Sequence, residues 1–180
     1  RVIMETNRLP RYDVSDNPTH CCPRFNSQGW DEQELHFSAK RFVMAKTRSL
    51  CHVPLNMHSV FKKTLAAIDK ADAQEAEQFI VLSHDPSAWA AEHYFAVNRD
   101  VPGQKMLQLS GDYLTKVFEG PYSDAPNWAR HMTSLVRSRG KQVLKHYFFY
   151  TTCPTCAKYY GKNPVVAVAE VGPVATSHGG

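Results

Sequence analysis

The chain has 180 residues, of which 43% are hydrophobic, 11% aromatic and 21% charged, and its formal net charge is +4. This apolar content excludes a disordered chain, and no uncharged stretch approaches the roughly 20 apolar residues of a membrane-spanning helix. The small net charge argues against nucleic acid as a partner. We expect one compact cytoplasmic protein, a monomer or homodimer, with neither membrane nor nucleic acid among its partners.

The first 35 residues are rich in turn-forming proline, asparagine and glycine and show no regular hydrophobic period. We predict that residues 1–35 form an extended arm lying on the domain, anchored by Phe25 and Trp30. Residues 36–172 are expected to form a single domain, and residues 173–180 a loose tail.

The first half of the domain, residues 36–101, is predicted to contain a strand, a helix and two further strands. The first strand is expected over Phe42–Val53 and the later ones over Phe79–Ser83 and Tyr94–Val97, where β-branched and aromatic residues gather. Asn56 is placed to cap the helix. The apolar face of that helix is formed by residues at helical spacing: Val60, Phe61, Leu65, Ile68 and Ala71.

The second half, residues 102–172, repeats this order at a shift of about 67 residues. Strands are predicted over Lys105–Glu119, Lys145–Thr151 and Val165–Val171. The helix between the first two of these strands begins near Ser123 or Asp124 and ends near Gly140, and its apolar face carries Trp128, Met132, Leu135 and Val136. We therefore predict an α+β fold of two tandem βαββ modules with pseudo-twofold symmetry. Curved antiparallel sheets would carry the helices on one side, and a cleft would form where the modules meet.

Several segments together resemble the GyrI-like small-molecule-binding domains, which are built from tandem SHS2-type modules. They are Phe118-Glu119-Gly120-Pro121-Tyr122, the helix bearing Trp128, and Ala169-Glu170-Val171 in the last strand. A bacterial subgroup of hydrolases is also similar, through Cys21-Cys22-Pro23 and the run from Cys153 to Lys158. The resemblance implies a ligand cleft reached by a last-strand glutamate, the position of Glu170, and a relation to cyclopropanoid hydrolases.

Acid–base chemistry is predicted at Glu119, Glu170 and His52. Both glutamates end strands that otherwise look buried, where a carboxylate is costly unless it is paired or faces a cleft. His52 occupies the position equivalent to Glu119 in the other half, and histidine titrates near neutral pH. Strand-end carboxylates in water and an incidental histidine are the alternative interpretation.

Aromatic residues are candidates for the walls of a substrate site, because flat rings bind planar ligands and attract cations. Tyr122 and Trp89 are expected in loops at the rim of the cleft. The remaining candidates, for which a place in the core is the competing interpretation, are Trp128, Tyr147 and Phe149.

The cysteines suggest a metal site, because Cys153 and Cys156 form a Cys-x-x-Cys pair. Cys22, with Cys21 or His20, could complete a zinc site if the arm packs against that pair. A redox pair or disulfide, and plain structural thiols, remain open. No cofactor is otherwise required.

We predict a cofactor-free hydrolase that uses glutamate acid–base chemistry on an aromatic or electrophilic small molecule. The alternative is a non-catalytic protein that binds and sequesters lipophilic cationic aromatic compounds. A protein-interaction role such as gyrase inhibition is a third class, which no residue pattern requires.

Overall fold

The computed structural model describes residues 5–175 except 52 and 76. After an irregular arm, the elements are β1 (Glu34–Leu50), β2 (Val53–Pro54), α1 (Met57–Lys70), β3 (Val81–Ser87), β4 (Ala90–Ala96), β5 (Lys105–Glu119), a 3-10 turn (Tyr122–Asp124), α2 (Ala125–Ser138), β6 (Lys141–Tyr150), α3 (Pro154–Tyr160) and β7 (Pro164–Pro173). The predicted α+β class is confirmed, while the pseudo-twofold relation between the halves stays a prediction.

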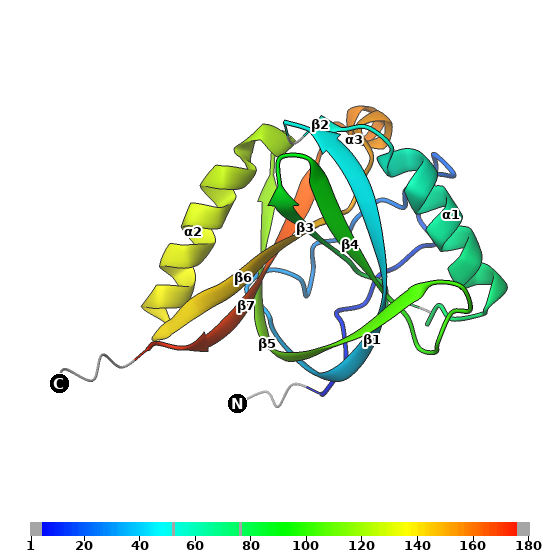
Figure 1. The fold of residues 1–180 in the computed structure, drawn as a ribbon. Coiled ribbons are helices and arrows are strands. Elements are labelled where there is room, and N and C mark those ends of the chain that lie inside the picture. The colour runs from blue at the N-terminus through cyan, green and yellow to red at the C-terminus, as the bar shows by residue number, and fades with distance from the viewer. Residues whose placement is uncertain (1–4, 52, 76, 176–180) are drawn as a thin grey trace.

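Six strands of the described chain form one antiparallel sheet in the order β1-β4-β3-β6-β7-β5. Pairing of β1 with β5 brings the two ends of this order together, so the sheet closes on itself, and β2 extends β1 only briefly. Pairing between β3 and β6 is short, because only Ser83 and Phe148 are paired between these strands. Figure 1 shows α1 and α2 packed outside this closed sheet, at opposite edges of the molecule.

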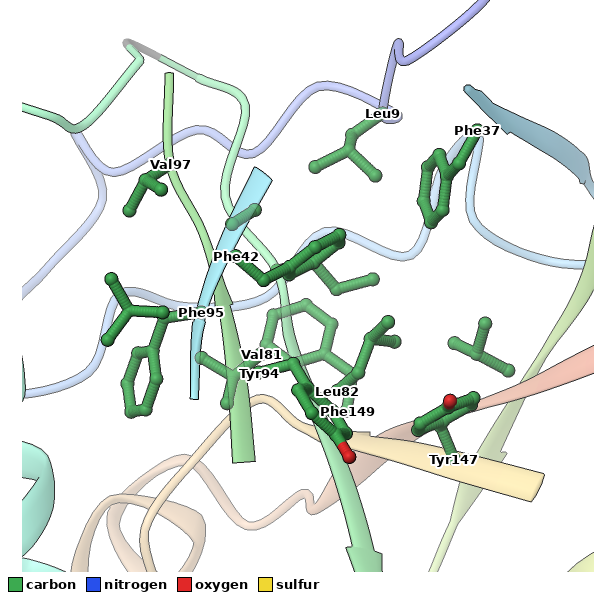
Figure 2. Packing of buried hydrophobic residues seen from close by; sticks show 14 of the residues in the cluster. Leu9, Phe37, Phe42, Val81, Leu82, Tyr94, Phe95, Val97, Tyr147 and Phe149 are labelled. Carbon is green, nitrogen blue, oxygen red and sulfur yellow. The ribbon is translucent and has the colours of Figure 1, made fainter. Parts of the chain in front are cut away.

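Residues alternate between two surfaces of the sheet. On β7, Ala167, Ala169 and Val171 pack in the same cluster as Met132 of α2, so they face outward. Val166 and Val168, which alternate with these residues, point to the opposite surface, which we call the inner face. Figure 2 shows part of this packing, including Phe42, Tyr94, Tyr147 and Phe149. Helix α1 packs on the outer surface through Phe61, whose ring lies 5.0 Å from that of Phe95.

The helix boundaries depart modestly from the sequence prediction. Asn56 occupies the cap position of α1, but its side chain does not cap the helix; its Oδ1 accepts a hydrogen bond of 2.7 Å from the backbone N–H of Arg48 instead. Gly140 follows the end of α2 with φ of 74°, a conformation that glycine tolerates best. The segment between the last two strands, expected as a loop, contains helix α3, with Cys153 at its cap position.

The arm packs against the inner face through its aromatic residues. Trp30 is fully buried, and its ring lies 5.5 Å from Phe149. Phe25 and Tyr12 approach the same ring at 6.2 and 6.0 Å. The arm therefore supplies part of the protein's own core.

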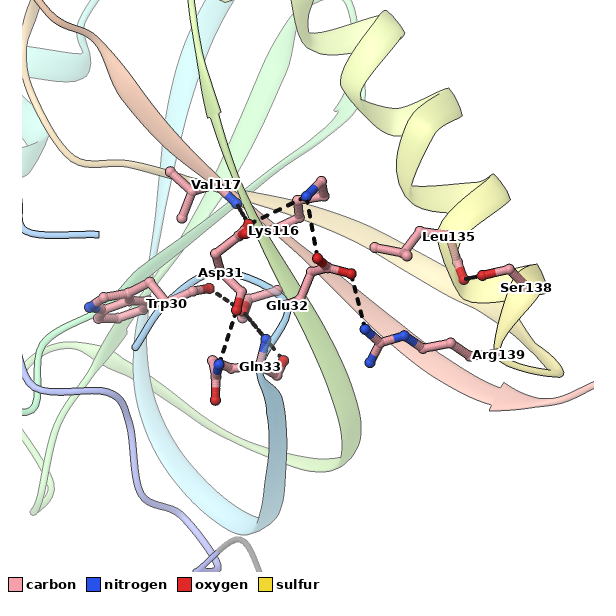
Figure 3. Close-up of polar contacts among 10 residues, drawn as sticks. Trp30, Asp31, Glu32, Gln33, Lys116, Val117, Leu135, Ser138 and Arg139 are labelled. Atoms are coloured by element: carbon pink, nitrogen blue, oxygen red, sulfur yellow. Dashed lines mark hydrogen bonds and ion pairs between the residues drawn. The ribbon is translucent and has the colours of Figure 1, made fainter. Parts of the chain in front are cut away.

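Polar contacts hold the end of the arm on β5 and α2, as Figure 3 shows. The Thr115 hydroxyl donates to the backbone oxygen of Trp30, and the Val117 N–H donates to Asp31 Oδ1 at 2.9 Å. Glu32 lies 3.1 Å from the Arg139 guanidinium. Such exposed ion pairs contribute little individually, so the aromatic packing carries more of the stability.

We expect Trp30→Ala to lower the free energy of unfolding by about 3–5 kcal/mol, because it removes a fully buried indole. Trp89→Ala is the matched control, since Trp89 is 61% exposed; it should change stability by less than about 0.5 kcal/mol. Urea unfolding of both variants measures the difference. Equal effects would contradict a core role for the arm.

Candidate functional site

Glu170 lies on the inner face of β7, among tyrosines and charged groups. In the register of the sheet, Tyr113 of β5 pairs with it on one side and Lys145 of β6 on the other. Tyr147 lies two residues beyond Lys145 and therefore on the same face. Glu170 and Lys145 are half-buried, whereas Tyr113 and Tyr147 are buried.

The facing strands complete this group, which we call the Glu170 cluster: Glu170, Lys145, Tyr113, Tyr147, Tyr94 and Glu92. The rings of Tyr94 and Tyr147 meet edge to face at 5.9 Å. The Tyr94 hydroxyl donates a 2.9 Å hydrogen bond to Glu92. Lys145 Nζ lies 5.6 Å from the centre of the Tyr94 ring and 5.1 Å from that of Tyr147.

The tyrosines of this cluster are held in the protonated form. Burial raises the pKa of Tyr94 to about 12, assisted by Glu92. Burial, with Glu170 nearby, also raises the pKa of Tyr113 and of Tyr147. Phenols that stay neutral at physiological pH serve as hydrogen-bond donors.

Gly111 keeps space beside the Glu170 carboxylate. A Cβ at this position would lie 3.6 Å from Glu170 Oε1 and 4.0 Å from the Tyr113 ring. Its φ of 128° also disfavours other residues. Gly111 therefore lies directly beside the Glu170 carboxylate on the β5 side.

A groove of about 1950 Å³ lies elsewhere, and its lining does not include Glu170 or Lys145. It is bordered by α1, the start of α2, α3 and the arm. Tyr122 and Phe149 line it, together with Phe61, Phe148 and Tyr150. The Tyr122 hydroxyl donates a 2.6 Å hydrogen bond to the backbone oxygen of Thr152, which fixes the ring at the rim.

A buried histidine network also borders the groove. His93 Nδ1 lies 2.7 Å from the Ser83 hydroxyl, and its Nε2 lies 2.8 Å from the Thr47 hydroxyl. A serine beside a histidine is the arrangement of an activated nucleophile. However, Ser83 and His93 are only 5% and 2% exposed, and the third partner is a hydroxyl where a carboxylate would orient the ring better. We therefore interpret the network as a link between β1, β3 and β4.

Four cysteines converge at one end of the groove. The sulfur atoms of Cys21, Cys22, Cys153 and Cys156 all lie within 4.8 Å of one another. Cys156 is buried, and Cys21 is exposed. Burial acts to raise the pKa of Cys156, but hydrogen bonding with Thr19 and the neighbouring thiols outweighs it and brings the pKa to about 7. The predicted residues Cys22, Cys153 and Cys156 are thus brought together; Cys21, and not His20, accompanies them.

The other predicted residues are dispersed. Glu119 is exposed and pairs with Pro164, six positions before Glu170 and so about 20 Å away along the strand. His52 lies outside the described residues. Trp89 is exposed in the turn between β3 and β4, while Trp128 is buried and stacks on Phe118 at 5.6 Å. Sequence reasoning missed Lys145, Glu92, Tyr94 and Tyr113. Strand alternation places Lys145 on the same face as Tyr147, but only the strand register brings these residues to Glu170.

The chain belongs to a bacterial hydrolase family, whose model matches residues 12–171. A comparison with curated proteins gives no match. None of the helices in the described ranges is long and apolar enough to cross a membrane.

Solved structures show the same fold at low identity. An uncharacterized conserved protein from Listeria innocua has a TM-score of 0.56 and 13% identity, covering 79% of this chain and 92% of its own. A hydrolase from Listeria innocua has a TM-score of 0.55 and 11% identity over the same shares. The EcmrR C-terminal domain has a TM-score of 0.57 and 13% identity, covering 81% of this chain and 99% of its own.

The His93 network predicts a pH-dependent loss of stability. Burial lowers the pKa of His93 to about 4 from the ordinary 6.5, so between these values the unfolded chain binds a proton that the folded chain does not. Stability contributed by neutral His93 is complete above pH 6.5 and is lost as the pH falls toward 4; the loss between pH 7 and pH 5 is about 2 kcal/mol.

Urea unfolding at the two pH values measures this loss. His93→Gln should remove the His93 contribution, so its stability should fall less on acidification than that of the wild type. His58→Gln is the control, because His58 is exposed on α1 and the variant keeps the buried network. An unchanged pH dependence in His93→Gln would contradict this interpretation.

Proposed function

We propose that the protein hydrolyses small electrophilic molecules at the Glu170 cluster. The observation that carries the proposal is a half-buried carboxylate placed opposite an ammonium group and among buried tyrosines. The bacterial hydrolase family supports the reaction class. The resemblance to GyrI-like domains supports Glu170 as the residue that meets the ligand.

The proposed reaction is the addition of water to an activated acyl carbon. Glu170 accepts a proton from water as the hydroxide adds to the carbon, and negative charge develops on the former carbonyl oxygen. Lys145 and the hydroxyl groups of Tyr113 and Tyr147 are suited to stabilise that oxygen. When the bond to the leaving group breaks, the proton held by Glu170 passes to the leaving atom, so Glu170 returns to its starting state.

The position of Lys145 also restricts the charge that a bound substrate can carry. A ligand cation binds best over the face of an aromatic ring. Lys145 Nζ already lies over Tyr94 and Tyr147, at 5.6 and 5.1 Å. A second cation over these two rings would be repelled by Lys145, whose own charge is balanced by Glu170 and Glu92. We therefore expect a neutral electrophile or one that develops negative charge. This argues against sequestration of lipophilic cations as the primary function.

Glu170→Gln should lower kcat/KM on a panel of aryl esters, lactones and strained-ring electrophiles by about 100-fold or more, because the amide cannot accept the proton from water. Glu34→Gln is the control, since Glu34 is an exposed carboxylate at the start of β1. Stopped assays with product detection by mass spectrometry give the rates.

Two results would reject the proposal: a folded wild-type protein that turns over nothing in the panel, or a Glu170→Gln variant as active as the wild type. Saturable binding without product would favour the sequestration alternative. Glu119→Gln belongs in the same panel, because equal loss there would favour the two-glutamate chemistry expected from the sequence.

Lys145→Gln should increase affinity for a lipophilic aromatic cation such as tetraphenylphosphonium by about tenfold, since it removes a like charge from the ring faces. Lys141→Gln, at the start of β6, is the control. Calorimetric titration of each variant measures the affinities. If wild type and Lys145→Gln bind the cation equally well, the Lys145 ammonium does not determine substrate charge.

A further inference from the structure

We propose that Cys21, Cys22, Cys153 and Cys156 together bind one zinc ion through four thiolates. The four sulfur atoms lie within 4.8 Å of one another, and no histidine or carboxylate of the described residues joins the group. Two ligands come from the arm and two from the start of α3. The site therefore connects two segments that are far apart in the sequence, since Cys22 and Cys153 are separated by 131 positions.

The separations of the sulfurs fit a tetrahedral ion. Zinc–sulfur bonds are about 2.3 Å long, which places the sulfurs of a tetrahedral site about 3.8 Å apart. Cys21 Sγ and Cys22 Sγ are 3.7 Å apart. A disulfide would require about 2.05 Å, and all four residues are free thiols. Each sulfur has three sulfur neighbours within 4.8 Å, so small side-chain movements suffice for all four to share one ion.

Backbone and side-chain contacts already hold the arm cysteines in place. The Cys153 N–H donates to Cys22 Sγ at 3.4 Å, as the outer shell of a thiolate site commonly does. The Tyr160 hydroxyl, one helical turn after Cys156, donates a 2.6 Å hydrogen bond to the backbone oxygen of Cys22. Thr19 Oγ1 accepts from the N–H groups of Cys21 and Cys22 at 3.4 and 3.3 Å.

The donor set selects the metal and its role. Four sulfurs favour zinc over magnesium or calcium, which prefer oxygen ligands. Four protein ligands complete the tetrahedral shell and leave no position for water or substrate, so the site is structural. A zinc ion at this site would hold the middle of the arm, between the aromatic residues Tyr12 and Phe25, against α3.

The test begins with full-length protein purified under reducing conditions from zinc-supplemented medium. Elemental analysis should find about one zinc per chain, because a closed four-thiolate site binds tightly at neutral pH. Cys22→Ser and Cys156→Ser should each retain less than about a tenth of this zinc. Cys51→Ser is the matched control: Cys51 is exposed and lies outside the cluster, so its zinc content should equal that of the wild type.

A second measurement keeps the proposal testable if the serine variants fail to fold. Chelation of zinc from the wild-type chain should lower its melting temperature and increase tryptic cleavage in the arm, at Arg11 or Arg24, by about tenfold. Addition of Zn²⁺ should reverse both changes, and Co²⁺ should give the strong visible absorption of tetrahedral thiolate coordination.

The proposal is overturned if folded, reduced protein contains no stoichiometric zinc and does not take up Zn²⁺ or Co²⁺. It is also overturned if the cluster holds iron, if non-reducing peptide mapping finds two disulfides among the four cysteines in freshly prepared protein, or if Cys51→Ser loses zinc equally. Because Glu170 lies outside this cluster, the outcome is independent of the proposed hydrolase activity.

Discussion

The antiparallel register around β7 is the constraint on which the rest of this structure depends. Residues 165–171 of β7 each have a partner on β5 and another on β6, so the alternation of side chains fixes three strands at once. Alanines and Val171 face α2, while Val166, Val168 and Glu170 face inward. A slip by one residue would bury the carboxylate beneath α2 and expose the core valines, so the register that stabilises the protein also positions Glu170.

The inner face has two regions with different chemistry. Around Phe149 it is filled by aromatic rings of the arm, which bury apolar surface without requiring polar partners. Around Glu170, four positions further along β7, half-buried carboxylate and ammonium groups lie beside buried tyrosines. Charges that remain partly solvated cost far less than fully buried ones. The charged groups of the inner face therefore lie at its partly solvated positions, apart from the aromatic core.

The arm links the proposed metal site to the fold. Its aromatic residues belong to the main core, its end is hydrogen-bonded to β5, and Cys21 and Cys22 lie against the start of α3. Closing such a long irregular segment costs conformational entropy. The aromatic packing, the hydrogen bonds to β5 and the contacts with α3 together compensate for this loss of entropy. The structural similarity to the Listeria innocua proteins and the EcmrR C-terminal domain, which covers about four fifths of the chain, identifies the fold but not the chemistry.

The sequence alone indicated the α+β class, the two longer helices and most of the strands, and it drew attention to Trp30, Glu170 and the Cys-x-x-Cys pair, but it did not indicate α3. These follow from local periodicity and residue type, which nearest neighbours along the chain decide. Only the tertiary structure decided that Lys145 and Tyr113 flank Glu170, that Glu119 lies apart, and that Cys21 completes the cysteine group. Those relations depend on strand register and on contacts between residues more than a hundred positions apart, and no local pattern encodes them.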